Sequence, residues 1–326
     1  MKSPKDYIEF CKANIFPELE ELEEKRKAIS SKRYSLLLVV LILLVTQIIA
    51  YLLGYIPFWT ILIGIFIVPF VFAYIYNHMF QDDGIVEEMQ DIVVKKSAIF
   101  LLEKPVFDAK LFIDYGSYFS NSRLFLMLPE HYGGRNQAKG LLGNYPTLFS
   151  EIDCGYDALD DEGKSKWQSI FKGLFLITAF EKDLGIEAVV LPSELENNLY
   201  LLGKQIQKQH FQRGNSVPFH EDKEFSKHYV VYAEKPLETS KVLSSLVRKM
   251  LLNFSEKTGL QVYLSFMGSK IYFAFHGETL LNVDLKKTLL DFEQLQNFYL
   301  CLSLVEIVLD DFNKRFVTKK GIDWSI

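Results

Sequence analysis

Two uninterrupted apolar runs dominate the pattern near the start of the chain. They are Leu36–Leu53 and Phe58–Tyr76, joined by the short stretch Gly54–Pro57, and residues 34–81 contain no Asp, Glu, Lys or Arg before the chain becomes polar again. A helix rises about 1.5 Å per residue, so each run is long enough to cross about 30 Å of hydrocarbon. The pattern predicts a two-helix transmembrane hairpin over residues 34–78, with a buried hairpin in a soluble core as the alternative.

The basic residues around this hairpin predict its orientation. Lys25, Arg26, Lys27, Lys32 and Arg33 precede the first run, whereas the short turn carries no basic residue. Because positive charge is retained on the cytoplasmic side, the N-terminus is expected inside, and a second span returns the rest of the chain to the same side. The sequence therefore predicts a multi-pass protein of the cell membrane with both termini in the cytoplasm.

The flanking segments have helical and then strand-like patterns. Residues 1–33 form an expected cytoplasmic amphipathic helix, and residues 79–104 form a linking helix. Farther on, short apolar runs bounded by Gly, Asp or Pro are typical of strands. They are Tyr145–Cys154, Phe171–Phe180, Glu187–Leu191, Ser216–His220, Phe225–Ala233, Gln261–Phe266 and Lys270–His276.

Longer periodic and polar segments complete the predicted domain. Apolar residues at helical spacing predict helices from Pro236 to Lys257 and from Leu285 to Lys314, and the polar stretch Asp153–Lys166 is expected to be a surface loop. The fold class expected for residues 105–314 is thus α+β, with a mostly antiparallel sheet and long helices. This cytoplasmic domain is a single body or two lobes meeting near 205–225, followed by a tail at 315–326.

Composition narrows the expected partners. A net charge of -5 gives no reason to expect nucleic-acid binding. Cys11, Cys154 and Cys301 are scattered and odd in number, which favours free thiols in a reducing compartment over a disulfide framework or a zinc site. No cofactor or metal is predicted, and the expected partners are the lipid bilayer and a membrane or cytoplasmic protein.

The densest titratable cluster is His220-Glu221-Asp222. Neighbouring residues of a strand point to opposite faces, so only His220 and Asp222 can converge on a catalytic or metal site. A charged, solvated turn is the competing interpretation. Cys154 lies near carboxylates that raise the pKa of its thiol, which argues against a reactive nucleophile.

Two further groups of residues are candidates for contacts. Thr46 and Gln47 are the strongly polar side chains of the first apolar run, and Gln47 is expected to bond to the second helix or to another copy of the chain in a homo-oligomer. Aromatic residues of predicted strands pack in the core or line an apolar groove for a peptide or lipid chain. They are Phe171, Phe175, Phe266 and Tyr272.

Several aromatic and glycine blocks carry a resemblance to a known family. They include Tyr115–Phe125, Tyr132–Gly134, Gly143–Tyr145, Phe171–Phe175 and Tyr229–Tyr232. The chain resembles a family of uncharacterised bacterial membrane proteins with two transmembrane helices, a domain of unknown function sometimes labelled "galanin". The resemblance implies an architecture and a cytoplasmic membrane location. It implies no activity, and an acidic pair that members often carry is missing after Tyr132.

These patterns favour one function over two alternatives. The first is a membrane-anchored, cytoplasm-facing module without enzymatic activity that binds or scaffolds a protein or lipid partner. A membrane-bound enzyme with its site in the cytoplasmic domain is the alternative that the His220 cluster would support. An oligomeric channel or transport accessory built from the hairpin is the third, and it would bring copies together at Gln47.

Overall fold

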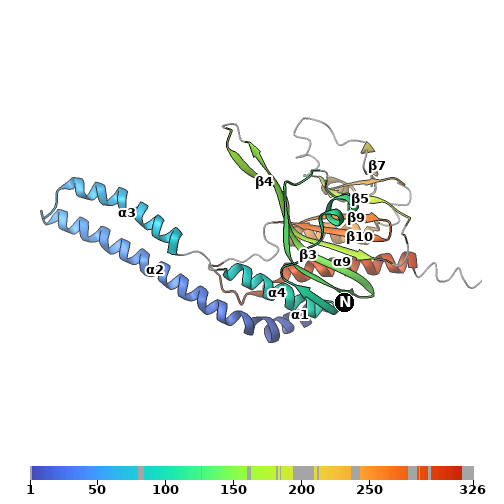
Figure 1. Cartoon of the computed structure of the whole chain (residues 1–326), viewed down its shortest axis with the longest axis horizontal. Coiled ribbons are helices and arrows are strands. Elements are labelled where there is room, and N and C mark those ends of the chain that lie inside the picture. Colours follow the sequence, from blue (N-terminus) through green and yellow to red (C-terminus); the bar gives the residue numbers. More distant parts are fainter. Residues whose placement is uncertain are drawn as a thin grey trace, which may run out of the picture. The chain divides into compact units, whose positions relative to one another are not determined.

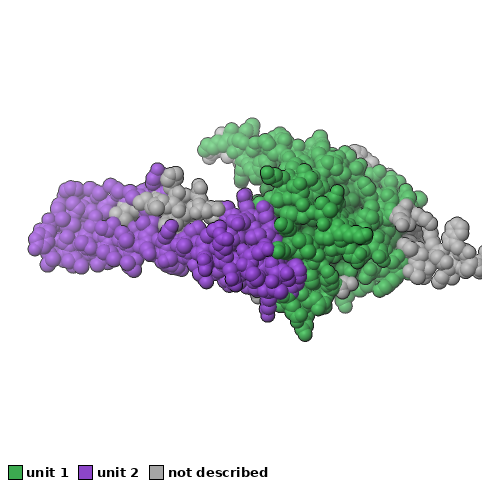
Figure 2. Space-filling model, turned by 60° about the horizontal axis from the view of Figure 1, so that its bottom comes forward, with its two compact units in different colours: residues 1–9, 94–282, 293–326 green, residues 10–93, 283–292 purple. Residues whose placement is uncertain are grey.

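The computed structural model describes most of the chain: residues 2–79, 84–125, 127–159, 163–180, 183, 185–193, 209–210, 213–235, 243–277, 285, 287–292 and 295–317. The chain divides into two compact units, which Figure 2 colours separately. One contains residues 1–9, 94–282 and 293–326, and the other contains residues 10–93 and 283–292. A short piece of the C-terminal part therefore belongs to the same unit as the long N-terminal helices.

Long helices build the N-terminal part of the chain. They are α1 (Pro4–Phe10), the π-helical turn η1 (Cys11–Ile15), α2 (Phe16–Leu52), α3 (Phe58–Met79) and α4 (Ile85–Leu101). Gly54 adopts a φ of +79° in the turn after α2, a conformation that favours glycine. Within Pro4–Leu52, an 18-residue window has a mean hydropathy of 2.7 and no buried part. By length and composition this helix can cross a membrane, which confirms the predicted long apolar helix.

A buried ion pair joins α2 to the C-terminal piece of its unit. Glu23 is 3% exposed and accepts hydrogen bonds from Arg26 at 2.7 and 2.8 Å and from the backbone N–H of Leu289 at 3.0 Å. Arg26 also donates to the carbonyl of Leu285 at 3.1 Å. The hydrogen bond from Arg26 is the main cause that lowers the pKa of Glu23 to about 2. An ionised Glu23 thus ties residues 285–292 to α2.

The other unit is organised around one sheet of ten strands in the order β1-β2-β3-β4-β10-β9-β5-β8-β7-β6 (Figure 1), and the paired strands are antiparallel. This sheet confirms the predicted α+β class. The strands are β1 (Glu103–Asp108), β2 (His131–Leu142), β3 (Tyr145–Leu159), β4 (Ser165–Ala179), β5 (Ala188–Pro192), β6 (Gln209–His210), β7 (Gly214–Ser216), β8 (Tyr229–Ala233), β9 (Gln261–Met267) and β10 (Lys270–His276).

Both faces of the central strands are buried. On one face α8 (Ser245–Thr258) and α9 (Gln296–Phe312) pack, and the rings of Phe149 and Phe298 have their centroids 5.5 Å apart. On the other face, the turn η2 (Ser117–Asn121) places Tyr118 against Phe175, with centroids 5.1 Å apart. Burying such a side chain contributes about 1.5–3 kcal/mol, so the aromatic content of these strands stabilises the sheet from both sides.

The structure corrects several predictions in this unit, among them the strand Ser216–His220, of which only Ser216 lies in a strand, β7. The stretch Asp153–Lys166, predicted to be a loop, extends β3 to Leu159 and begins β4 at Ser165. The polar composition of this stretch suggests a loop. A solvent-exposed ribbon of two strands has the same composition, because neither of its faces packs on a core. Phe225, predicted to lie in a strand, instead belongs to α6 (Lys223–His228), whose start is capped by the carboxylate of Asp222 at 3.1 Å from the Phe225 N–H.

The two long C-terminal helices are shorter than predicted. The last helix α9 begins at Gln296 rather than Leu285, and the described residues between 285 and 292 are not α-helical and belong to the unit of α2. The helix α8 begins at Ser245, and its predicted start at Pro236 lies outside the described residues. Part of the predicted lobe boundary near 205–225 and most of the predicted tail at 315–326 also lie outside them.

Candidate ligand-binding site

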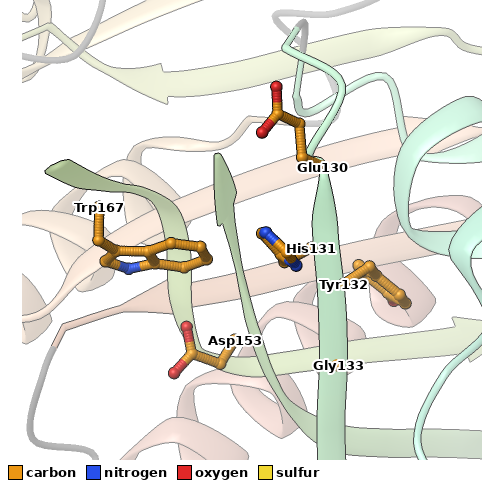
Figure 3. Close-up of a pocket in the computed structure, with 6 residues that line it drawn as sticks. All are labelled: Glu130, His131, Tyr132, Gly133, Asp153 and Trp167. Atoms are coloured by element: carbon orange, nitrogen blue, oxygen red, sulfur yellow. The ribbon is translucent and has the colours of Figure 1, made fainter. Parts of the chain in front are cut away.

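A hollow of about 530 Å³ lies where the ribbon formed by β3 and β4 leaves the sheet. Beyond Gly155, β3 pairs with β4 alone in the described residues, and this ribbon projects from the sheet in Figure 1. Six residues from β2, β3 and β4, and from the residue before β2, line the hollow and are drawn in Figure 3. They are Glu130, His131, Tyr132, Gly133, Asp153 and Trp167.

Gly155 allows the ring of Trp167 to lie across β3. The register of β3 and β4 shifts between Cys154 and Gly155, which marks a β-bulge. A Cβ on Gly155 would lie 2.6 Å from the Trp167 ring and 2.3 Å from the carbonyl oxygen of Gln168, so a larger residue would clash. The indole thereby approaches the imidazole of His131, with ring centroids 5.7 Å apart.

Neighbouring residues of β2 point to opposite faces of the sheet. In Figure 3 the ring of Tyr132 points away from His131. The Tyr132 hydroxyl donates a hydrogen bond to the carbonyl of Ile113 at 2.7 Å, and burial raises its pKa. Tyr132 therefore anchors β2 to the core, whereas His131 faces the solvent side of the hollow.

Three exposed side chains with metal-ligating atoms gather at the edge of the hollow. The ligand atoms of Glu130, His131 and Asp157 all lie within 4.8 Å of one another. Nε2 of His131 is 3.5 Å from Oδ2 of Asp157, and the Asp157 N–H donates to Oε2 of Glu130 at 3.2 Å. The Glu130 N–H donates to the carbonyl of Gly155 at 3.0 Å. Backbone hydrogen bonds thus position Glu130 and its carboxylate relative to β3.

The charges around the hollow are predominantly negative. Asp153 lines it and pairs with Lys172 at 3.5 Å. Glu130 and Asp157 add two more carboxylates beside the hollow. Such a surface attracts cations and repels phosphate.

The sequence-based prediction did not single out these residues. Their common signal is weak: His131 directly precedes the Tyr132–Gly134 block, and Trp167 is a solitary aromatic residue in a polar stretch. Only the pairing of β2 with β3 and of β3 with β4 brings them together.

The structure does not bring His220 and Asp222 into one site. Asp222 caps α6 and accepts a hydrogen bond from Nε of Arg248 at 2.7 Å, which lowers the pKa of Asp222. The Arg248 guanidinium also lies over the ring of Phe219 at 4.7 Å and is held in place by that contact. His220 is exposed beside this cluster. Asp222 therefore has a structural partner that accounts for its position.

The four candidate groove residues also divide between environments. Phe171, Phe175 and Tyr272 belong to the buried aromatic cluster around Tyr118, whereas Phe266 is buried on the opposite face of the sheet, as strand alternation requires. These side chains pack in the core in the described residues. The same cluster contains the thiol of Cys154, and burial is the main cause that raises its pKa, with a smaller contribution from Asp153.

Of the polar pair in the first apolar run, Gln47 lies against the second helix and Thr46 bonds within its own helix. Thr46 donates a hydrogen bond to the carbonyl of Ile42 at 2.7 Å, within its own helix. The Gln47 side chain packs on Gly64 of α3, where a Cβ would lie 2.0 Å from the Gln47 Oε1 atom. That oxygen is buried and has no hydrogen-bond partner among the described residues. A role for Gln47 in joining copies of the chain stays a prediction.

Comparison with known proteins identifies one domain. Residues 169–314 match the family described as "Protein of unknown function (DUF3137)". The match confirms a domain of unknown function. It does not extend to the two-helix membrane family or to the "galanin" label.

Two further comparisons add no functional information. No curated protein matches the chain. A solved structure titled "crystal structure of the mycobacterial trehalose monomycolate transport factor A, TtfA" has 5% sequence identity and a TM-score of 0.33, and the alignment covers 61% of this chain and 86% of that chain. At this level of likeness the two chains share neither a demonstrable fold nor a demonstrable function.

Proposed function

We propose that this chain is a membrane-anchored binding module without enzymatic activity, which captures a basic segment of a protein partner in the hollow beside the β3–β4 ribbon. The observation that carries the proposal is the combination of a concave surface, an exposed indole and several carboxylates. Trp167 is 45% exposed, although its side chain is large and mostly apolar. Exposed aromatic rings in concave surfaces are typical of sites that bind partners.

The chemistry of the hollow favours a basic partner. A Lys or Arg side chain over the face of Trp167 gains about 0.5–1 kcal/mol at an exposed site and adds a charge-assisted contact to Asp153. An anionic lipid headgroup would instead meet the three carboxylates and be repelled. Each of these contributions is small, so we expect weak capture whose rate and affinity fall as salt is added.

The anchor in this proposal is the pair α2 and α3, inserted as a hairpin with both chain termini in the cytoplasm. Large apolar side chains along α2 are exposed, among them Leu38, Leu41 and Leu52 at 58%, 57% and 74%. The basic stretch Lys25–Lys27 precedes the apolar run, which favours a cytoplasmic N-terminus.

A topology experiment tests the anchor. The chain, carrying an epitope tag after Ile326, is produced in bacterial cells, and its membranes are washed with alkaline carbonate. We expect the chain to remain in the membrane pellet and the tag to be cleaved by added protease only after the cells are opened. Release by carbonate, or cleavage of the tag in intact cells, would refute the proposed anchor or its orientation.

A fluorescence titration tests capture in the hollow. The chain has three tryptophans, at positions 59, 167 and 324, so the W59F/W324F variant leaves Trp167 as the reporter. The full-length variant in uncharged detergent is titrated with a ten-residue lysine peptide, a ten-residue glutamate peptide and phosphatidylglycerol vesicles. We expect a saturable, salt-sensitive change with the lysine peptide alone.

Matched carboxylate variants locate the binding. Asp153→Asn should weaken lysine-peptide binding by about 2- to 5-fold, the range for one exposed charge contact. Glu224→Gln removes an exposed carboxylate from α6 and should leave binding unchanged. Equal responses to both peptides, or none to the lysine peptide, would contradict the proposal. A response to the vesicles alone would assign a lipid ligand instead.

A further inference from the structure

We infer that Glu130, His131 and Asp157 form a binding site for a divalent transition-metal ion. Two independent observations point to a ligand at this position. The three side chains bring one nitrogen and two carboxylate groups within 4.8 Å of one another, and two of them, Glu130 and His131, also line the hollow. The inference goes beyond the proposed capture of a basic segment and does not rest on it, because the ion needs only these three side chains and no partner.

The geometry is close to that of a coordinated ion. Zinc binds imidazole nitrogen and carboxylate oxygen at about 2.0–2.2 Å, which places the ligands of a tetrahedral site about 3.4 Å apart. Nε2 of His131 and Oδ2 of Asp157 are already 3.5 Å apart. Their side chains are 63% and 48% exposed, so rotation of exposed side chains is enough to close the remaining distances.

One of the ligands, the carboxylate of Glu130, is positioned before any ion binds. The backbone N–H of Glu130 donates to the carbonyl of Gly155, and the backbone N–H of Asp157 donates to Oε2 of Glu130. The bond from Asp157 uses only Oε2 of Glu130, so Oε1 of Glu130 is the other oxygen that can bind an ion. The imidazole of His131 contacts the Trp167 ring on one side, with ring centroids 5.7 Å apart. Pre-positioned ligands lose less conformational entropy on binding, which favours a bound ion over three independent surface groups.

The donor set selects the class of ion. Imidazole suits zinc, iron, nickel and copper, whereas calcium and magnesium prefer sites made of oxygen ligands alone. Two carboxylates balance the charge of a divalent ion, and three protein ligands leave at least one coordination position available to water or to a group in the hollow. We therefore expect Zn²⁺ to bind and Mg²⁺ to compete poorly.

The chain also offers an internal control. His228 and Glu224 form an exposed pair on α6, with Nε2 of His228 3.1 Å from Oε1 of Glu224. This pair supplies one imidazole and one carboxylate, so it resembles the proposed site in exposure and chemistry but lacks the second carboxylate. A real three-ligand site should depend on His131 and not on His228.

Calorimetric titration of the full-length chain with Zn²⁺ tests the inference. The chain is purified in uncharged detergent through a tag without histidine, because a polyhistidine tag would bind the ion. We expect one saturable site at neutral pH. His131→Ala and Asp157→Asn should each weaken it at least about 10-fold, since even loss of an outer-shell partner of a metal site costs about 10–100-fold. His228→Ala should leave the affinity unchanged.

Cobalt provides a second readout that separates coordination from folding. Co²⁺ bound by imidazole and carboxylate should give visible absorption in the parent chain and in His228→Ala, and none in His131→Ala. Far-ultraviolet circular dichroism of each variant verifies that the sheet is intact. Absence of saturable Zn²⁺ binding in the folded parent, or equal binding by parent and His131→Ala, would overturn the inference, whatever the peptide titration of Trp167 shows.

Discussion

Removing the charge of Glu23 should release the C-terminal piece of the chain from α2. The pKa of Glu23 falls from an ordinary 4.5 to about 2, mainly because Arg26 donates hydrogen bonds to it. Each unit of pKa corresponds to about 1.4 kcal/mol, so ionised Glu23 favours the folded arrangement by about 3 kcal/mol. Since its side chain is 4% exposed, screening by solvent reduces this contribution little. Glu23→Gln should remove most of it.

Hydrogen exchange measures this loss directly. The Leu289 N–H donates to Glu23, so peptides covering residues 285–292 report the contact. A loss of about 3 kcal/mol corresponds to exchange up to about 100-fold faster in Glu23→Gln at neutral pH. Glu21→Gln is the matched control, because Glu21 is 78% exposed and pairs with Lys25 on the surface. Its exchange should match that of the parent chain.

The stabilisation by Glu23 should decrease as the pH falls, and this direction tests the assignment. A carboxylate with a depressed pKa contributes its full stabilisation above its unfolded pKa near 4.5 and loses it as the pH falls toward 2. Thermal melts of the parent and of Glu23→Gln should therefore differ at pH 6 and converge as the pH is lowered below 4. Equal melts at pH 6, or a difference at pH 2 as large as the one at pH 6, would refute the assigned role of this ion pair.

Three other substitutions test the described packing. Gly155→Val should displace the indole from the imidazole and shift its fluorescence, whereas Gly133→Ala should not, because a Cβ at position 133 would meet only one atom, at 4.0 Å. Gly64→Leu should separate the two apolar helices and lower the melting temperature in detergent, because a Cβ there would already lie 2.0 Å from a buried amide oxygen. Arg248→Met should lower the free energy of unfolding by about 1.5–3 kcal/mol, judged from chemical denaturation, because it removes a 2.7 Å charge-assisted hydrogen bond to the partly exposed Asp222. Unchanged unfolding of either of the last two variants would contradict the packing that predicts it.

The sequence predicts the elements whose signals are local. The hairpin of β9 and β10 is an example, since Gln261–Phe266 and Lys270–His276 alternate around a short Gly-containing turn and the observed strands differ by one residue. The charge-free stretch likewise predicts an apolar helix that the structure contains. In both cases the residues that carry the pattern lie within the element that they predict.

The candidate site was unpredictable for the opposite reason. His131 and Asp157 are far apart in the chain. They meet only because β2 pairs with β3 in one register, and a β-bulge then shifts the register between β3 and β4. The ribbon that carries Asp157 and Trp167 is exposed on both faces, so it lacks the alternation that reveals a strand. Asp222, by contrast, was visible as part of a cluster, but its pairing with Arg248 depends on α8.

The matched domain does not include the residues that line the hollow. The shared segment begins at residue 169, partway along β4, so it takes in the central strands and the helices α8 and α9. Every residue that lines the hollow precedes it. The matched segment alone therefore carries the strands and helices at the centre of the sheet, and none of the side chains on which the proposed capture depends.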